Sequence, residues 1–279
     1  MSEVISNKKK PGILNPRKLP PKRNYRDHLL KFRRVLIRIV AITMLLAVLA
    51  FMNRPFIFDK ILLAPKTEEF FTNRMLCLIG ERLEIDNLCF NTEALTIINV
   101  NMAGQFLTHL YVSIVAGVIL AFPYILFEIW TFLAAILKIK NQRTTIATIS
   151  AGSFLFVLGL LFSYFLIVPL TVNFLGTYFV SSEVQNTVML GSYISTIASL
   201  ILGVGIFFEL PVFVYFLARY AIVSPDWLKK MRRIMIVIIL IISAIITPPD
   251  IISQIMVCIP LIILYEVSIW LAKRAYKPG

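Results

Sequence analysis

The chain has 279 residues, of which 58% are hydrophobic and only 15% are charged, and its mean hydropathy is +0.83. A soluble domain of this size needs more charge on its surface, so the composition excludes an ordinary soluble protein and indicates a polytopic membrane protein. The formal charge of +13 is typical of nucleic-acid-binding proteins, but the basic residues lie between apolar runs, which argues against that class of partner.

The first 24 residues have the composition of a disordered basic tail. They contain Lys8–Lys10 and four prolines, a pattern that does not build a packed core and is favourable beside an anionic membrane leaflet. The apolar run after Arg34 is too long for the core of a cleavable signal peptide and lacks a small-residue cleavage site. It therefore predicts a first membrane span that stays in the protein.

Six apolar runs form the predicted membrane domain, residues 25–275. A helix needs roughly 20 residues to cross about 30 Å of hydrocarbon. The predicted spans are Val35–Met52, His109–Leu137, Thr145–Leu170, Ser192–Ala218, Ile234–Ile246 and Ile251–Leu271. The fifth run would form a helix of only about 20 Å, so the turn after it must sit deep or the bilayer must thin around it.

Basic residues alternate between the connections. Lys and Arg number eleven in residues 1–34, three in 138–143, five in 219–233 and three after 271, whereas residues 53–107 hold five against seven acids. Cytoplasmic loops carry such an excess of Lys and Arg. The chain is therefore predicted to be a multi-pass inner-membrane protein with both termini in the cytoplasm.

The segment 53–107 is the largest predicted extracytoplasmic element. Its apolar residues recur with helical spacing, which predicts amphipathic helices at the outer interface. Cys77 and Cys89 lie in this segment, and an extracytoplasmic compartment permits a disulfide between them. Two free thiols are the alternative. Residues 171–191 form a second outer connection, which has no basic residue.

Prolines mark two boundaries in the second half of the chain. Ser224 followed by Pro225 predicts a helix start, with Ser as the N-cap and Pro at the first helical position. The run Thr247-Pro248-Pro249-Asp250 must break the chain between the fifth and sixth spans, because two prolines cannot continue a helix. Backbone groups at such a deep turn need a protein partner or water.

Three carboxylates lie inside apolar runs, namely Glu128, Glu209 and Glu266. An acidic residue at a helix centre costs about 2.5–3.5 kcal/mol on insertion scales, so each is a candidate for function. A protonated or hydrogen-bonded structural residue is the alternative. Function is favoured for Glu209, because Pro211 loosens its helix, and a structural role for the other two. Gln254 either bonds a partner helix or is structural.

Catalytic signatures are missing from the sequence. It has no His pair with metal-ligand spacing, no Gly-x-Ser-x-Gly elbow and no phosphate-binding loop. The sequence therefore predicts no enzyme activity and no metal site.

Several strings occur in a specific order over residues 25–275. They are Gly104-Gln105-Phe106, Pro123-Tyr124, Tyr164-Phe165 with Pro169, Phe207-Phe208-Glu209-Leu210-Pro211-Val212, Ser224-Pro225, Thr247-Pro248-Pro249-Asp250 with Ser253-Gln254, and Tyr265-Glu266. In order and spacing these strings resemble the TatC family, the signal-peptide receptors of the twin-arginine translocase.

The resemblance implies an all-α, glove-shaped bundle of six helices with short fifth and sixth spans. It implies twin-arginine signal peptides at the cytoplasmic face, TatA-type and TatB-type single-span partners, self-association, and export of folded proteins by the proton-motive force without a cofactor. Glu209 matches the family's intramembrane glutamate, and Gln254 matches a polar position at the partner-helix site. Pro248, Pro249 and Asp250 match its structural turn.

The signal-binding positions depart from the family pattern. Where the family has His-Leu-x-Glu-Leu-Arg, this chain has His28-Leu29-Leu30-Lys31-Phe32-Arg33, and Asn141 replaces a glutamate after the second span. The resemblance places the signal-peptide site at Lys31, Arg33 and Asn141. Without the two carboxylates, this site is expected to depend only weakly on paired arginines.

Two other functional classes stay open from the sequence alone. A proton-coupled secondary transporter could use Glu209 and the break at 247–250 as a midplane site, although such transporters have paired breaks and only one is visible here. A membrane assembly factor would hold single-span helices without translocating anything. Co-purification of single-span proteins and exported precursors would favour the translocase.

Overall fold

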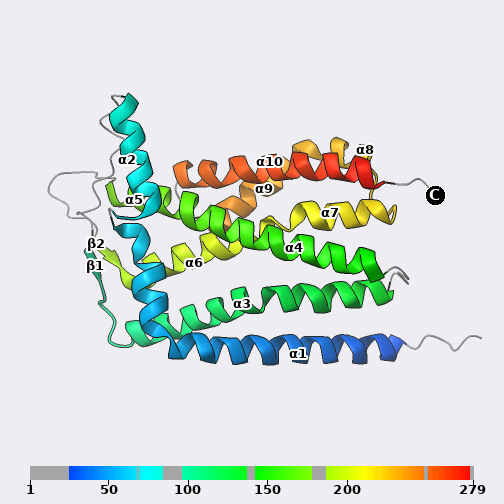
Figure 1. The fold of residues 1–279 in the computed structure, drawn as a ribbon, viewed down its shortest axis with the longest axis horizontal. Coiled ribbons are helices and arrows are strands. Elements are labelled where there is room, and N and C mark those ends of the chain that lie inside the picture. The colour runs from blue at the N-terminus through cyan, green and yellow to red at the C-terminus, as the bar shows by residue number, and fades with distance from the viewer. Residues whose placement is uncertain are drawn as a thin grey trace, which may run out of the picture.

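The computed structural model describes residues 25–67, 69–83, 96–136, 142–177, 187–247 and 251–276. Long helices lie side by side along one axis, and shorter elements cross one end of them (Figure 1). We call this the strand end, because strands β1 (Thr96–Ile98) and β2 (Thr187–Met189) lie there. The described start of α1 and the end of α10 both lie at the opposite end, which we call the terminal end.

The bundle consists of helices whose bounds are α1 (Tyr25–Met52), α3 (Gly104–Ile136), α4 (Gln142–Phe162), α5 (Val168–Thr177), α6 (Leu190–Phe207), α7 (Leu210–Arg219), α8 (Pro225–Lys230), α9 (Arg232–Ile246) and α10 (Ile251–Ala275). The π-helix η5 (Ser163–Ile167) joins α4 to α5. Among the described residues, five segments are long and apolar enough to cross a membrane: Leu30–Met52, Gly104–Ile136, Ile146–Gly176, Leu190–Arg219 and Ser253–Ala275.

These five segments coincide with five of the six predicted spans. The sixth apolar run forms α9, whose 15 residues give a length of about 22 Å, so a short helix at this position is confirmed. The short sixth span that the resemblance implied is wrong. Helix α10 has 25 residues and continues past Leu271, because Lys273 and Arg274 are favourable in a last helical turn.

The third predicted span also ends later than expected. Helix α5 continues to Thr177, so the first residues of the predicted outer connection are helical. Pro169 does not end the helix, although its missing N–H leaves the carbonyl of Phe165 without its usual donor. The wider π-helical turn η5 lies there, and the Thr72 hydroxyl donates to that carbonyl.

Helices α6 and α7 are separated by a break at Phe208 and Glu209. Pro211 lies at the start of α7, where its missing N–H costs least. The prediction that Pro211 loosens this span is confirmed. Ser224 likewise caps α8, since its hydroxyl accepts a hydrogen bond of 3.2 Å from the Trp227 N–H.

The segment between α1 and α3 crosses the strand end of the bundle. It contains η1 (Phe56–Leu62), η2 (Ala64–Lys66) and α2 (Phe71–Leu83), and α2 stands across the bundle axis in Figure 1. One face of α2 exposes Phe71, Met75 and Leu78, so an amphipathic helix is present. Its location at the outer membrane interface remains a prediction.

The fold is not purely helical. Strands β1 and β2 pair in parallel, with Thr96 opposite Thr187 and Ile98 opposite Met189. Their β-branched residues suit extended backbone. This pairing joins the two connections that the sequence treated as separate outer segments.

Side-chain amides and hydroxyls fasten the crossing segment to the bundle. Asn73 donates to the carbonyls of Pro65 and Thr67 at 3.2 and 2.9 Å, and its Oδ1 accepts from Asn173 of α5 at 3.1 Å. Asn73 and Asn173 are almost fully buried. Because buried polar groups are costly unless they are bonded, these contacts define one position for the segment.

Apolar side chains form two buried clusters. The larger one runs through α5, α6 and α10, with Ile194, Ile197, Leu200, Val257, Leu261 and Ile269 at its centre. The smaller one joins α3, α4 and α7, where the rings of Phe122 and Phe156 stack with centroids 3.5 Å apart. Helix α1 lies at the edge and exposes Met44, Leu45 and Val48, as a lipid-facing helix would.

Helix α1 packs on α3 through small residues. A Cβ added at Gly117 would lie 2.8 Å from each of three atoms, the Ala47 Cβ, the Ala47 backbone nitrogen and the Thr43 carbonyl oxygen. Membrane helices associate mainly by close packing, and glycine permits the approach of the two backbones.

We therefore expect Gly117→Ala to lower the stability of the detergent-solubilised protein by about 1–3 kcal/mol, the range for overpacking. The measurement is its thermal melting temperature. Gly191→Ala is the matched control, since its added Cβ would meet only Thr108 Oγ1, at 3.8 Å. Equal melting temperatures for the two variants would contradict the close α1–α3 contact.

Candidate functional site

Glu128 of α3 is paired across the α1–α3 contact. Its Oε1 lies 3.4 Å from Nη1 of Arg38 and accepts a hydrogen bond of 2.6 Å from the Tyr124 hydroxyl. The residue is only 6% exposed. A buried carboxylate is tolerated when it is paired and hydrogen-bonded, so this cluster joins α1 to α3 at one depth.

Glu209 has a different environment, at the break between α6 and α7. Its Oε1 is buried and has no hydrogen-bond partner among the described residues. A Cβ at Gly152 of α4 would lie 2.7 Å from Glu209 Oε2 and 3.3 Å from Leu126 Cδ1. Gly152 therefore makes the space for the carboxyl group, which lies against apolar side chains with an unused acceptor.

Gln254 lies near the start of α10 and bonds a neighbouring helix. Its Nε2 donates to the carbonyl of Leu240 on α9 at 3.1 Å. Helix α9 ends at Ile246, and Thr247 is extended while its hydroxyl donates to the Ser243 carbonyl at 2.8 Å. The predicted structural residues Pro248, Pro249 and Asp250 lie outside the described residues. No hydrogen bond within the described part of the chain joins Gln254 to Glu209.

Glu266 forms an ion pair at the surface. Its Oε2 lies 2.6 Å from Nη2 of Arg232, and both side chains are about half exposed, at 47%. Exposed pairs contribute little to stability. The pair instead joins the start of α9 to α10 near the terminal end.

Lys31 and Arg33 lie on the first turns of α1, and both are exposed. The ring of Phe32 lies 5.8 Å from that of Phe132 on α3, so the start of α1 lies beside the end of α3. Asn141 follows α3 but is outside the described residues. The structure therefore brings the start of α1, with Lys31 and Arg33, beside the end of α3, and the contribution of Asn141 remains a prediction.

Cys77 of α2 is disulfide-bonded. Its predicted partner, Cys89, lies outside the described residues, so the pairing of the two remains a prediction. Cys258 is free and buried in α10.

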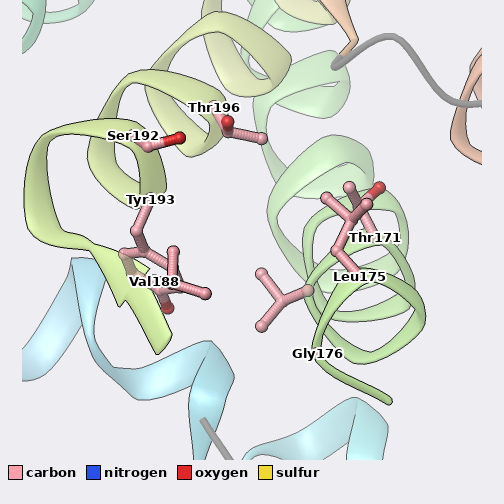
Figure 2. A pocket seen from close by; sticks show the side chains of 8 residues that line it. Thr171, Leu175, Gly176, Val188, Ser192, Tyr193 and Thr196 are labelled. Carbon is pink, nitrogen blue, oxygen red and sulfur yellow. The ribbon is translucent and has the colours of Figure 1, made fainter. Parts of the chain in front are cut away.

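Two further observations concern metal ions and the small hollow beside β2. The described part of the chain contains no group of three His, Cys, Asp or Glu residues that could bind a metal ion. A hollow between α5 and α6 beside β2 is lined by residues that include Thr171, Leu175 and Tyr193 (Figure 2). Its volume is about 140 Å³. Ligand pockets are usually larger, about 300–1,000 Å³, and none of the predicted site residues lines this one.

Comparison with known proteins identifies the family. The model of the family described as Sec-independent protein translocase protein (TatC) matches residues 27–260. The chain belongs to the TatC family. The resemblance seen in the sequence motifs is thereby confirmed, and the transporter and assembly-factor hypotheses gain no support from the match.

Curated TatC proteins are similar over most of the chain. The Sec-independent protein translocase protein TatC of Blattabacterium sp. subsp. Periplaneta americana is 36% identical over 248 residues, which cover 88% of this chain and 93% of the relative. TatC of Carboxydothermus hydrogenoformans is 38% identical over 62% of this chain and 72% of its own length.

The fold agrees with that of a solved TatC. The crystal structure of the twin-arginine translocase receptor TatC superposes with a TM-score of 0.72 at 30% identity, covering 89% of this chain and 99% of that one. A second crystal structure of the receptor, in the detergent DDM, gives a TM-score of 0.73 at 29% identity. The chain is therefore a multi-pass membrane protein of the translocase.

The Arg38–Glu128 pair is the site feature that sequence reasoning missed in this TatC. The two residues are 90 positions apart, and no local pattern links them. The bond between Tyr124 and Glu128 could have been predicted from the sequence, because residues four positions apart lie on the same face of a helix. The place of Gly152 against Glu209 had no sequence signal, since it depends on how α4 packs on the α6–α7 break.

Proposed function

We propose that this TatC-family subunit is the signal-peptide receptor and core of a twin-arginine translocase, which exports folded proteins across the inner membrane by using the proton-motive force. The observation that carries the proposal is the agreement with the solved twin-arginine translocase receptor over 99% of that chain. Single-span TatA-type and TatB-type proteins and signal peptides are the proposed partners, together with lipid and further copies of this chain.

The proposed topology has six spans, with α9 as a short fifth one and both termini in the cytoplasm. The start of α1 and the end of α10 lie at the same end of the bundle (Figure 1), which an even number of crossings requires. Among the described residues, basic side chains of α1, α8 and α10 lie at this terminal end, namely Lys31, Arg33, Lys229, Lys230, Lys273 and Arg274. Cytoplasmic loops carry such an excess of Lys and Arg. The strand end, with α2 and its proposed Cys77–Cys89 disulfide, would then face the outside.

An impermeant thiol reagent tests this topology in intact cells. Thr187→Cys in β2 should be labelled from outside, whereas Asp226→Cys in α8 should react only after lysis, because both positions are exposed and lie at opposite ends. The parent protein measures background from its own cysteines. Labelling in the reverse order would contradict the proposal.

Glu209 is the proposed intramembrane functional residue. Its position at a helix break, with a buried and unbonded oxygen, supports this role, because a carboxyl group without partners in the membrane is unfavourable and is retained for a reason other than packing. By contrast, Glu128 already bonds Arg38 and Tyr124, which supports a structural role.

We expect Glu209→Ala to abolish most export while the protein remains in the membrane. Removing the carboxyl group relieves an insertion cost of about 2.5–3.5 kcal/mol, so loss of export would not reflect failed insertion. The measurements are the exported fraction of a twin-arginine precursor and the amount of protein in the membrane. Ile206→Ala, at an exposed position one turn earlier, is the control. Full export by Glu209→Ala would make Glu209 a structural residue.

The proposed partner-helix surface is the face of α9 and α10 around Gln254. Ile241 and Ile245 of α9 are exposed, as are Ile255 and Ile259 of α10. A short helix that bonds Gln254 through a backbone carbonyl leaves the rest of this apolar face for a single-span partner. Close packing and hydrogen bonding between membrane helices would hold that partner.

The proposed signal-binding face consists of Lys31, Arg33 and Asn141. Lys31 and Arg33 are exposed, and Arg34 follows them. The buried Glu128 carboxylate already bonds Arg38. Arginines of a signal peptide would therefore meet like charges here, which repel by about 1 kcal/mol at 4 Å in water. We infer that this receptor recognises signals with weak dependence on their paired arginines.

The test replaces both arginines of a native signal peptide with lysines. Export by the parent protein should fall only modestly, whereas Lys31→Glu combined with Asn141→Glu should make the preference for arginine stronger, because carboxylates accept paired hydrogen bonds from guanidinium. Lys230→Glu, a charge reversal at an exposed position of α8, controls for net charge. Severe and equal losses in both backgrounds would refute weak arginine dependence.

A further inference from the structure

An apolar groove lies between the helices on one side of the bundle, towards the strand end. Its walls come from α1, η1, α3, the α4–η5 helix and α6, and Leu49, Ile57, Val115, Leu161 and Ile201 are representative lining residues. Its volume is about 630 Å³, within the range of pockets that bury small ligands. We call it the lateral groove.

Two polar side chains line the lateral groove, and both donate hydrogen bonds within the protein. The amide of Asn53 donates to the Leu49 carbonyl at 2.8 Å, and the Tyr164 hydroxyl donates to the Ile61 carbonyl at 2.9 Å. The remaining lining residues are apolar. An occupant of the groove therefore gains by burying apolar surface and does not need to offer polar groups there.

Two hydrogen bonds attach η1 to the helices that border the groove. The hydroxyl of Tyr164 bonds the Ile61 carbonyl, and the buried hydroxyl of Tyr193 bonds the Leu62 carbonyl at 3.1 Å. These two bonds fix the last turn of η1 across the helices. The chain segment that borders the groove at the strand end is therefore pre-organised.

The rim of the groove carries one positive charge. The ammonium of Lys60 lies 6.0 Å from the ring centre of Phe56, and Phe56 lines the groove. Lys60 is exposed and takes part in no ion pair among the described residues. Arg54 and Asp59 line a different hollow beside η1, together with His109, and Asp59 takes part in no ion pair among the described residues.

We propose that the lateral groove binds one anionic phospholipid, with an acyl chain in the groove and the phosphate at Lys60. A narrow acyl chain fits the volume and the apolar lining. The unpaired ammonium at the rim favours a headgroup with net negative charge.

Native mass spectrometry of the detergent-purified full chain tests the proposal, with added phosphatidylglycerol or phosphatidylethanolamine of identical acyl chains. We expect one phosphatidylglycerol to bind to the parent protein and phosphatidylethanolamine to bind several-fold more weakly. Lys60→Gln should weaken phosphatidylglycerol binding about fivefold, the effect of one basic side chain near a membrane surface. Arg54→Gln, on the same segment but lining the other hollow, should leave binding unchanged.

A second variant tests the position of the acyl chain. Ala116→Phe adds a ring to the wall of the groove and should weaken binding of phosphatidylglycerol about tenfold, which corresponds to losing about two buried methylene groups. Equal binding of both lipids, or equal effects of Lys60→Gln and Arg54→Gln, would overturn the proposal. Lipid binding is measured directly, so its outcome is independent of the proposed role in export.

Discussion

Inside a bilayer every backbone polar group needs a partner within the protein, and each proline in a membrane helix leaves a carbonyl without its donor. In this TatC-family chain, different prolines are accommodated in different ways. Before Pro169 a π-helical turn widens the helix and the Thr72 hydroxyl bonds the Phe165 carbonyl. At Pro211 the helix divides instead, which creates the break that holds Glu209.

The hydrogen bond that compensates for Pro169 also shapes the strand end. Thr72 belongs to α2, so satisfying a carbonyl of the bundle also attaches α2 to it. Asn73, the next residue, bonds Asn173, which lies four residues after Pro169 on α5. The crossing segment is therefore part of the same hydrogen-bonded unit as the spans, and separate bonds from Tyr164 and Tyr193 attach η1, which borders the lateral groove.

The intramembrane carboxylates show how the same side chain differs with its surroundings. Glu128 shares its oxygen between Arg38 and Tyr124 and strengthens the contact of α1 with α3. Glu209 lies against Gly152 and Leu126 with one oxygen unbonded. Since a buried oxygen without a partner is the costlier arrangement, the surroundings of Glu209 support its proposed intramembrane role.

The sequence by itself determined the membrane class, the positions of the apolar helices, the short helix α9 and the caps and breaks at Ser224 and Pro211, because apolar periodicity and the missing proline N–H act over a few residues. Only the tertiary structure decided the Arg38–Glu128 pair, the parallel pairing of β1 with β2, and the space that Gly152 leaves for Glu209. These features join residues far apart in the chain or depend on how whole helices pack. Contacts of that kind arise from the arrangement of the bundle, which local patterns of residues do not encode.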